Sequence, residues 1–128
     1  MAEVAATYEQ ADDGKAGGKA TGAFIVTWGP LANGDTGSWE RFAAYPDKSI
    51  HVYGTFGAAT VTIQGTNETG TPAQTPTLND PQGNALTYTS ERLEQLLENV
   101  NQIRPSVAGG GGTTSLTVKM LVQTVARR

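Results

Sequence analysis

The sequence contains no cysteine, and this absence excludes two common ways of stabilising a small domain. Neither a disulfide framework nor a zinc site built on thiolates can hold such a chain together. The stability of the protein therefore has to come from side-chain packing or from assembly with other chains.

Long apolar runs and concentrated basic charge are also missing. No window approaches the roughly 18 apolar residues of a membrane-spanning helix, and residues 1–22 lack the basic start and apolar centre of a signal peptide. The nine basic and twelve acidic residues are scattered and give a net charge of −3, which leaves no basic stripe for nucleic-acid phosphates. We expect a soluble protein made in a cytoplasm, without a nucleic-acid or membrane partner.

Patterns typical of catalysis, metal binding or cofactor binding are absent too. His51 is the only histidine, so a metal or general-base site would have no second imidazole. Gly14, Gly18 and Lys19 approach a phosphate-binding loop, but the spacing is one residue short and Ala20 replaces the required hydroxyl. We expect no enzymatic activity, no metal and no cofactor.

What the sequence does contain is alternation of apolar and polar residues at several places. The chain of 128 residues has the length of one domain and includes 16 glycines. Period-two alternation predicts strands in "AFIVTW" (23–28), "SIHVYG" (49–54), "ATVTIQG" (59–65) and "SLTVKMLVQ" (115–123). Several short strands separated by turn residues predict an all-β protein, an antiparallel β-sandwich or jelly roll. We expect the strands around 49–54 and 59–65 to be neighbours joined by a turn at Phe56–Gly57.

The first 22 residues differ in character from the rest. They hold Val4 and Tyr8 as their only sizeable apolar side chains, too few to offset the entropy lost on ordering. We therefore expect a flexible N-terminal arm over residues 1–22 and a β-sandwich domain over residues 23–128.

One segment has helical periodicity. "SERLEQLLENV" (90–100) spaces its apolar residues at i, i+3, i+4 and i+7, with Ser90 available as the N-cap. Pro105 would prevent an extension of such a helix. The sequence predicts one short helix here, with Leu96 in the core.

Four consecutive glycines, Gly109 to Gly112, allow three interpretations: a phosphate-binding loop, a flexible linker or a turn. The run has no lysine and is followed by a strand rather than a helix, which excludes the first. Glycine tolerates the positive φ of a tight turn. We expect a β-hairpin that places Arg104 to Val107 beside the last strand.

Aromatic side chains provide the remaining signal for binding. We assign about half of the aromatic residues, Trp28 and Phe24 first, to the core. The candidates for a contact surface are Val4, Tyr8, Trp39, Tyr53 and Phe56.

A series of motifs runs through residues 58–122: "IQGTN" (63–67), "DPQGNALT" (80–87), "IRPSV" (103–107), the glycine run and "TTSLTV" (113–118). The series resembles small structural proteins encoded in the head and tail modules of tailed bacteriophages. It covers about half of the chain, and its motifs are not catalytic ones.

The resemblance implies a decoration, or cement, protein: a small β-sandwich or jelly-roll module on the outer surface of the capsid, commonly trimeric, that clamps neighbouring major capsid subunits. The partners would be the major capsid protein and further copies of this chain, after synthesis in the bacterial cytoplasm. Two other interpretations stay open: another virion component of the tail, neck or fibre base, and a carbohydrate-binding β-sandwich that uses exposed aromatic residues.

Overall fold

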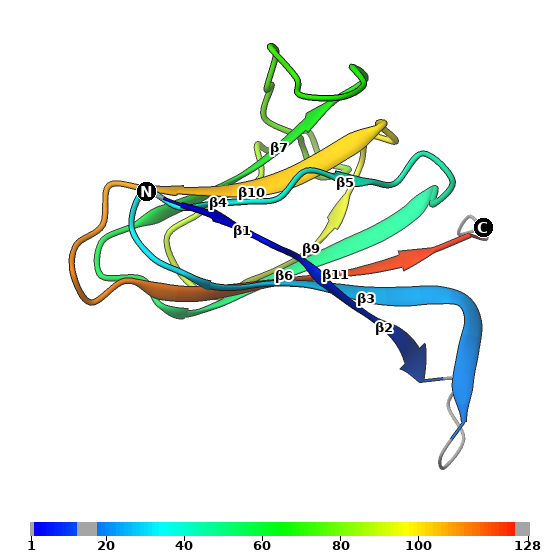
Figure 1. Ribbon diagram of the computed structural model, residues 1–128, viewed down its shortest axis with the longest axis horizontal. Helices are drawn as coiled ribbons and strands as arrows, with labels where there is room; N and C mark the ends of the chain where they lie inside the picture. Colours follow the sequence, from blue (N-terminus) through cyan, green and yellow to red (C-terminus); the bar gives the residue numbers. More distant parts are fainter. Residues whose placement is uncertain (1, 13–17, 125–128) are drawn as a thin grey trace.

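Two β-sheets enclose one core in the computed structural model, which describes residues 2–12 and 18–124 (Figure 1). Sheet A has the order β1 (Glu3–Val4), β4 (Thr36–Gly37), β10 (Gln102–Ala108), β7 (Thr60–Thr66) and β8 (Thr87–Tyr88), and β5 (Glu40–Arg41) also pairs with β10. Sheet B has the order β2 (Thr7–Asp12), β3 (Lys19–Leu31), β11 (Ser115–Gln123), β6 (Asp47–Thr55) and β9 (Arg92–Leu96). The pairs are antiparallel apart from the parallel pair β1–β4. The predicted all-β class is confirmed.

The core lies between the two sheets and follows the period-two alternation of the long strands. In β11 every second residue is fully buried, from Leu116 to Val122. These side chains meet inward-facing residues of sheet A such as Val61, Ile63 and Ile103. Since full burial of one such side chain contributes about 1.5–3 kcal/mol, this core is the main source of stability.

The predicted helix over residues 90–100 is wrong, because that segment forms β9 at the edge of sheet B. Arg92–Leu96 pairs antiparallel with β6, and only one leucine of the expected apolar stripe enters the core: Leu96 is 2% exposed, whereas Leu93 and Leu97 are 67% and 54% exposed. A helix of eleven residues is marginal in water. The open edge of β6 offers backbone hydrogen bonds along the segment, and this tertiary pairing overrides the local helical pattern.

The predicted hairpin at the glycine run is also wrong. β10 pairs with β4, β5 and β7 in sheet A, whereas β11 pairs with β3 and β6 in sheet B. Gly109–Gly112 therefore crosses from one sheet to the other. Gly109 has a φ of 77°, which favours glycine.

The turn at Phe56–Gly57 is likewise a crossing between sheets rather than a hairpin, since β6 lies in sheet B and β7 in sheet A. A hairpin within one sheet and a crossing between two sheets give the same alternation of apolar and polar residues in the strands, because every second residue faces the core in either sheet. The sequence pattern therefore does not distinguish the two connections. The two crossings lie next to each other, as the Ala59 Cβ near Gly110 shows.

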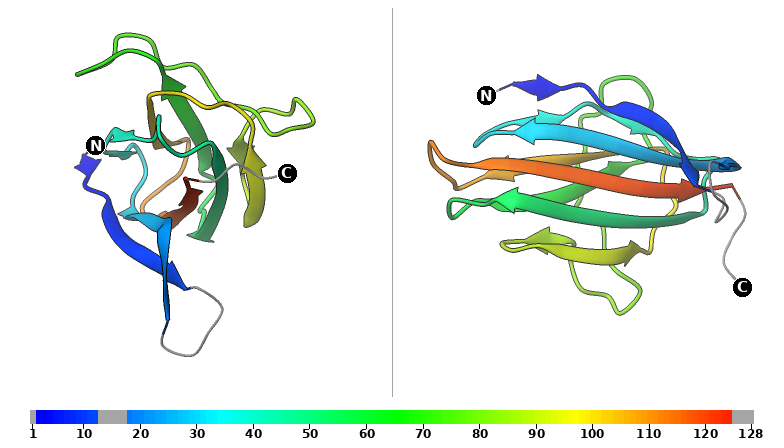
Figure 2. Two further views of the ribbon diagram at one scale, coloured as in Figure 1. Left: turned by 90° about the vertical axis from the view of Figure 1, so that its right-hand side faces the viewer. Right: turned by 90° about the horizontal axis from the view of Figure 1, so that it is seen from below.

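The N-terminal segment contacts both sheets. β1 pairs with β4 in sheet A and β2 pairs with β3 in sheet B, so residues 3–12 pass from one sheet to the other (Figure 2). β3 begins at Lys19, before the boundary expected at residue 23. Residues 1 and 13–17 of the expected arm, and residues 125–128 of the expected domain, lie outside the described residues. The independence of the arm in solution stays a prediction.

Candidate functional site

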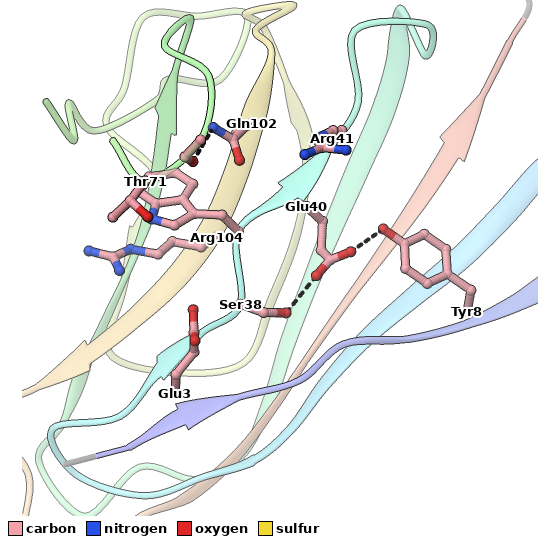
Figure 3. Close-up of a pocket in the computed structure, with 10 residues that line it drawn as sticks. Glu3, Tyr8, Ser38, Glu40, Arg41, Thr71, Gln102 and Arg104 are labelled. Carbon is pink, nitrogen blue, oxygen red and sulfur yellow. Dashed lines mark hydrogen bonds between the residues drawn. The ribbon is translucent and has the colours of Figure 1, made fainter. Parts of the chain in front are cut away.

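A cavity of about 610 Å³ opens where the N-terminal segment, β5 and β10 come together (Figure 3). Its wall includes Glu3 of β1, Tyr8 of β2, the segment 38–41, the loop residues 70–71, and two side chains of β10. The residues come from distant parts of the chain, and the sheet topology brings them together.

Arg104 and Trp39 form the centre of the wall. Arg104 lies between the buried Ile103 and Pro105, so alternation along β10 directs its side chain away from the core. Its guanidinium Cζ lies 4.5 Å from the centroid of the Trp39 ring, a cation–π contact that contributes about 0.5–2 kcal/mol. Its Nε donates a hydrogen bond of 2.8 Å to Oε1 of Gln64 on the neighbouring strand β7. The Arg104 side chain is therefore held in one orientation.

The surroundings of Arg104 also affect its ionisation. Burial lowers the pKa of its guanidinium, and the negative charge of Glu3 opposes this shift without reversing it. A lowered pKa indicates a cation that has lost part of its hydration without gaining a full counter-charge.

A second cluster fastens the N-terminal segment to the body. The Tyr8 hydroxyl donates to Oε1 of Glu40 over 2.6 Å, and the Ser38 hydroxyl donates to Oε2 of the same carboxylate over 2.6 Å (Figure 3). The Ser38 Oγ in turn accepts a hydrogen bond of 3.0 Å from the backbone N–H of Ala6. Burial, followed by the hydrogen bond to Glu40, raises the pKa of Tyr8. Both oxygens of Glu40 are thus occupied by donors of the same chain.

The loop on the opposite wall is held by Gln102, which is 3% exposed. Its Nε2 donates to the carbonyl oxygens of Glu68 and Gly70 over 2.9 and 3.1 Å. Asn101 Nδ2 donates to the Glu68 carbonyl as well, over 3.0 Å. These bonds fix the position of Gly70 and Thr71 at the cavity.

The structure brings together three of the five predicted contact residues. Tyr8 and Trp39 line the cavity, and Val4 lies beside it, where its carbonyl accepts a hydrogen bond of 2.8 Å from Ser38 N–H. Tyr53 lies on another face, with its ring 4.9 Å from that of His51, and Phe56 packs against the core. A role of any of the five in binding stays a prediction.

Sequence reasoning did not identify Arg104, Arg41, Glu40 or Gln102 as residues of this site. Arg104 was expected beside the last strand, in the wrong sheet. The only signal for it in the sequence is its polar character between two apolar positions of a strand, a pattern shared by many solvent-facing residues.

Within residues 2–12 and 18–124, no three histidine, cysteine, aspartate or glutamate side chains are grouped so that they could hold a metal ion. The same described residues include no helix of the length and apolarity needed to cross a membrane.

No protein-family model matches the sequence, and no curated protein matches it. The fold is similar to that of the SPBc2 prophage-derived protein YomS, whose crystal structure superposes with a TM-score of 0.54. The match covers 80% of this chain and 96% of that chain at 12% sequence identity. At this identity the likeness establishes a shared fold.

Proposed function

We propose that this protein is a structural component of a bacteriophage particle, specifically a decoration protein that binds the outer surface of the capsid and stabilises contacts between major capsid subunits. The observation that carries the proposal is the shared fold with a prophage-derived protein, which extends over nearly the whole of that protein. The motifs between residues 58 and 122 support the same class independently, since they resemble small structural proteins of tailed phages.

The architecture suits such a role. Hydrogen bonds fix the walls of the candidate site to a rigid sandwich, so little conformational entropy is lost when a partner binds. Five of the six residues of β2 are exposed, which leaves this edge strand free to contact a neighbour. Because a capsid repeats its surface many times, weak contacts of several linked copies would add up to firm attachment.

A carbohydrate-binding role is less well supported. Stacking of a sugar needs an open aromatic face, and Arg104 already covers one face of Trp39. A role in the tail, neck or fibre base uses the same fold and differs in the number of copies per particle.

The test is an electron-microscopy reconstruction of the phage that encodes this chain, together with the copy number of the protein relative to the major capsid protein. The proposal requires regular density on the outside of the head, at threefold or quasi-threefold positions. A few copies at the tail or neck would assign the protein to that part of the virion, and absence from the particle would refute a structural role.

A further inference from the structure

Two arginine side chains line the candidate cavity without an ion pair. The salt bridges among the described residues are Lys19–Asp12 and His51–Glu91, and neither lies at the cavity. The Nε of Arg104 donates to Gln64. Among the described residues, no side chain or carbonyl accepts a hydrogen bond from the terminal nitrogens of Arg104 or from the exposed Arg41.

The acidic side chains at the cavity do not satisfy these donors. Glu40 accepts one hydroxyl on each oxygen, from Tyr8 and from Ser38. Glu3 attracts Arg104 electrostatically but forms no ion pair with it. The cavity thus offers more N–H donors than its own carboxylates accept.

A partly buried guanidinium without a close counter-charge is energetically unfavourable, and a carboxylate placed against it removes that cost. The planar fork of arginine matches the two oxygens of a carboxylate, and such charge-assisted bonds are stronger than neutral ones. Contact with Trp39 and the bond to Gln64 orient Arg104 before a ligand arrives, so little side-chain entropy is lost on binding.

The formal charges at the cavity limit what it can accept. Arg41 and Arg104 are balanced by Glu3 and Glu40, so there is no excess positive charge to attract a phosphate or a nucleic acid. A side-chain carboxylate placed at either guanidinium makes these bonds without requiring such an excess.

We infer that this cavity binds an acidic polypeptide segment of another protein, with Arg104 and Arg41 each holding the carboxylate of an aspartate or glutamate side chain of that segment. The inference rests on the proposed function only for the identity of that protein, a virion component. Trp39 contributes by fixing Arg104, and Thr71 supplies a hydroxyl at the rim (Figure 3).

Nuclear magnetic resonance of the full chain tests this directly, because the protein has two tryptophans and hence two indole N–H signals. The Trp39 signal is assigned with Trp39→Phe. The probes are an acetylated and amidated hexaglutamate peptide and the corresponding hexaglutamine peptide. We expect a saturable shift of the Trp39 signal with the glutamate peptide and none with the glutamine peptide.

Matched arginine variants locate the binding residues. Arg41→Gln and Arg104→Gln should each weaken binding of the glutamate peptide about tenfold or more, as expected for a lost charge-assisted bond. Arg92→Gln, at an exposed position of β9 in the other sheet, should bind the peptide like the wild type. Urea melts verify that each variant is folded, and Arg41→Gln is informative even if Arg104→Gln unfolds, since Arg41 is exposed.

The inference is overturned if the Trp39 signal shows no saturable shift, if the glutamine peptide shifts it equally, or if Arg92→Gln loses as much affinity as the two cavity variants. Equal or tighter binding of glucuronate or inorganic phosphate would also refute a polypeptide ligand.

A particle-binding experiment separates this inference from the proposed function. If the wild type decorates heads and the double variant of Arg41 and Arg104 does so equally well at limiting concentration, only the inference fails, whereas absence of the wild type from particles refutes the function whatever the peptides do.

Discussion

Thr114 and Phe56 are joined by a hydrogen bond, in which the Thr114 hydroxyl donates to the Phe56 carbonyl oxygen over 2.9 Å. Thr114 ends the glycine-containing loop before β11, and Phe56 follows β6. The bond therefore links the two loops that cross between the two sheets at the same end of the protein. Its geometry depends on close approach of the backbone at Gly110.

Gly110→Ala should destabilise the protein by about 1–3 kcal/mol, the usual cost of overpacking. A Cβ at this position would collide with Thr114 Oγ1 and lie 2.8 Å from the Ala59 Cβ. The free energy of unfolding in urea measures the effect. Gly111→Ala is the matched control, because its Cβ would enter open space, and an equal effect of the two changes would contradict the packed-loop structure.

Leu96→Ala should lower the free energy of unfolding by about 2–5 kcal/mol, because it leaves a cavity in the core. Leu93→Ala should change it by less than about 0.5 kcal/mol, since the Leu93 side chain is 67% exposed. A helix with the predicted apolar stripe would bury both leucines. Similar losses for the two variants would therefore argue against β9.

Period-two alternation was sufficient to predict strands in the segments that form β3, β6, β7 and β11, because alternation records which side chains share a face. It was not sufficient to predict which strands pair. Residues 90–100 show the reason: leucines three and four apart are typical of a helix, but β6 offers an unpaired edge that no local pattern reveals. The hairpin prediction for the glycine run is wrong for the same reason. The sheet that β11 joins is decided by its pairing with β3 and β6, which are far away in the sequence.

Tyr8→Phe should lower stability by about 0.5–1.5 kcal/mol near neutral pH, because it removes the hydrogen bond to Glu40. The free energy of unfolding of the variant should also fall less at alkaline pH than that of the wild type. The pKa of Tyr8 is raised in the folded state, so the folded protein holds this proton more tightly, and the free energy of unfolding falls as pH rises above the ordinary tyrosine value of about 10.

Urea melts between about pH 9 and pH 11 compare the two proteins across the onset of tyrosine ionisation. Burial lowers the pKa of Lys48, and its contribution has the opposite sign, but both proteins share it. Burial also raises the pKa of Tyr88, again in both. A constant difference between the two melting series over this range would show that the Tyr8 proton is not linked to folding.

Thr7→Cys combined with Thr27→Cys should form a disulfide within one chain, since the two residues are register partners on β2 and β3. Directly opposed residues of antiparallel strands have Cα atoms about 4.5–5.5 Å apart, within the range of disulfides. The chain has no cysteine of its own to compete. Non-reducing electrophoresis and mass spectrometry of the intact protein show whether the disulfide has formed within one chain.

The control pair is Thr7→Cys with Thr87→Cys, because Thr87 lies on β8 in the other sheet. Cross-linked dimers or trimers in place of the intramolecular product would mean that the N-terminal segment binds a neighbouring copy instead of its own body. The control pair should not cross-link, and failure of the Thr7/Thr27 pair to do so would show that β2 does not dock as described.

Part of the candidate site could be predicted and part could not. Tyr8 and Trp39 stand out as large aromatic residues outside the strongest strand patterns, and both line the cavity. Arg104 reaches the same cavity only because β10 pairs with β7 in a register that places Gln64 opposite it. That register is set by long-range pairing, which a single sequence does not encode in any local pattern.

The position of β11 at the centre of sheet B has a consequence for biosynthesis. β3 and β6 do not pair with each other and depend on β11 for the sheet that joins them, as the right-hand view of Figure 2 shows. Because β11 follows all the other strands in the chain, a ribosome-bound nascent polypeptide cannot complete this sheet until residues 115–123 have left the exit tunnel. Until that moment the apolar faces of β3 and β6 are unprotected, so the risk of aggregation persists until β11 has joined the sheet.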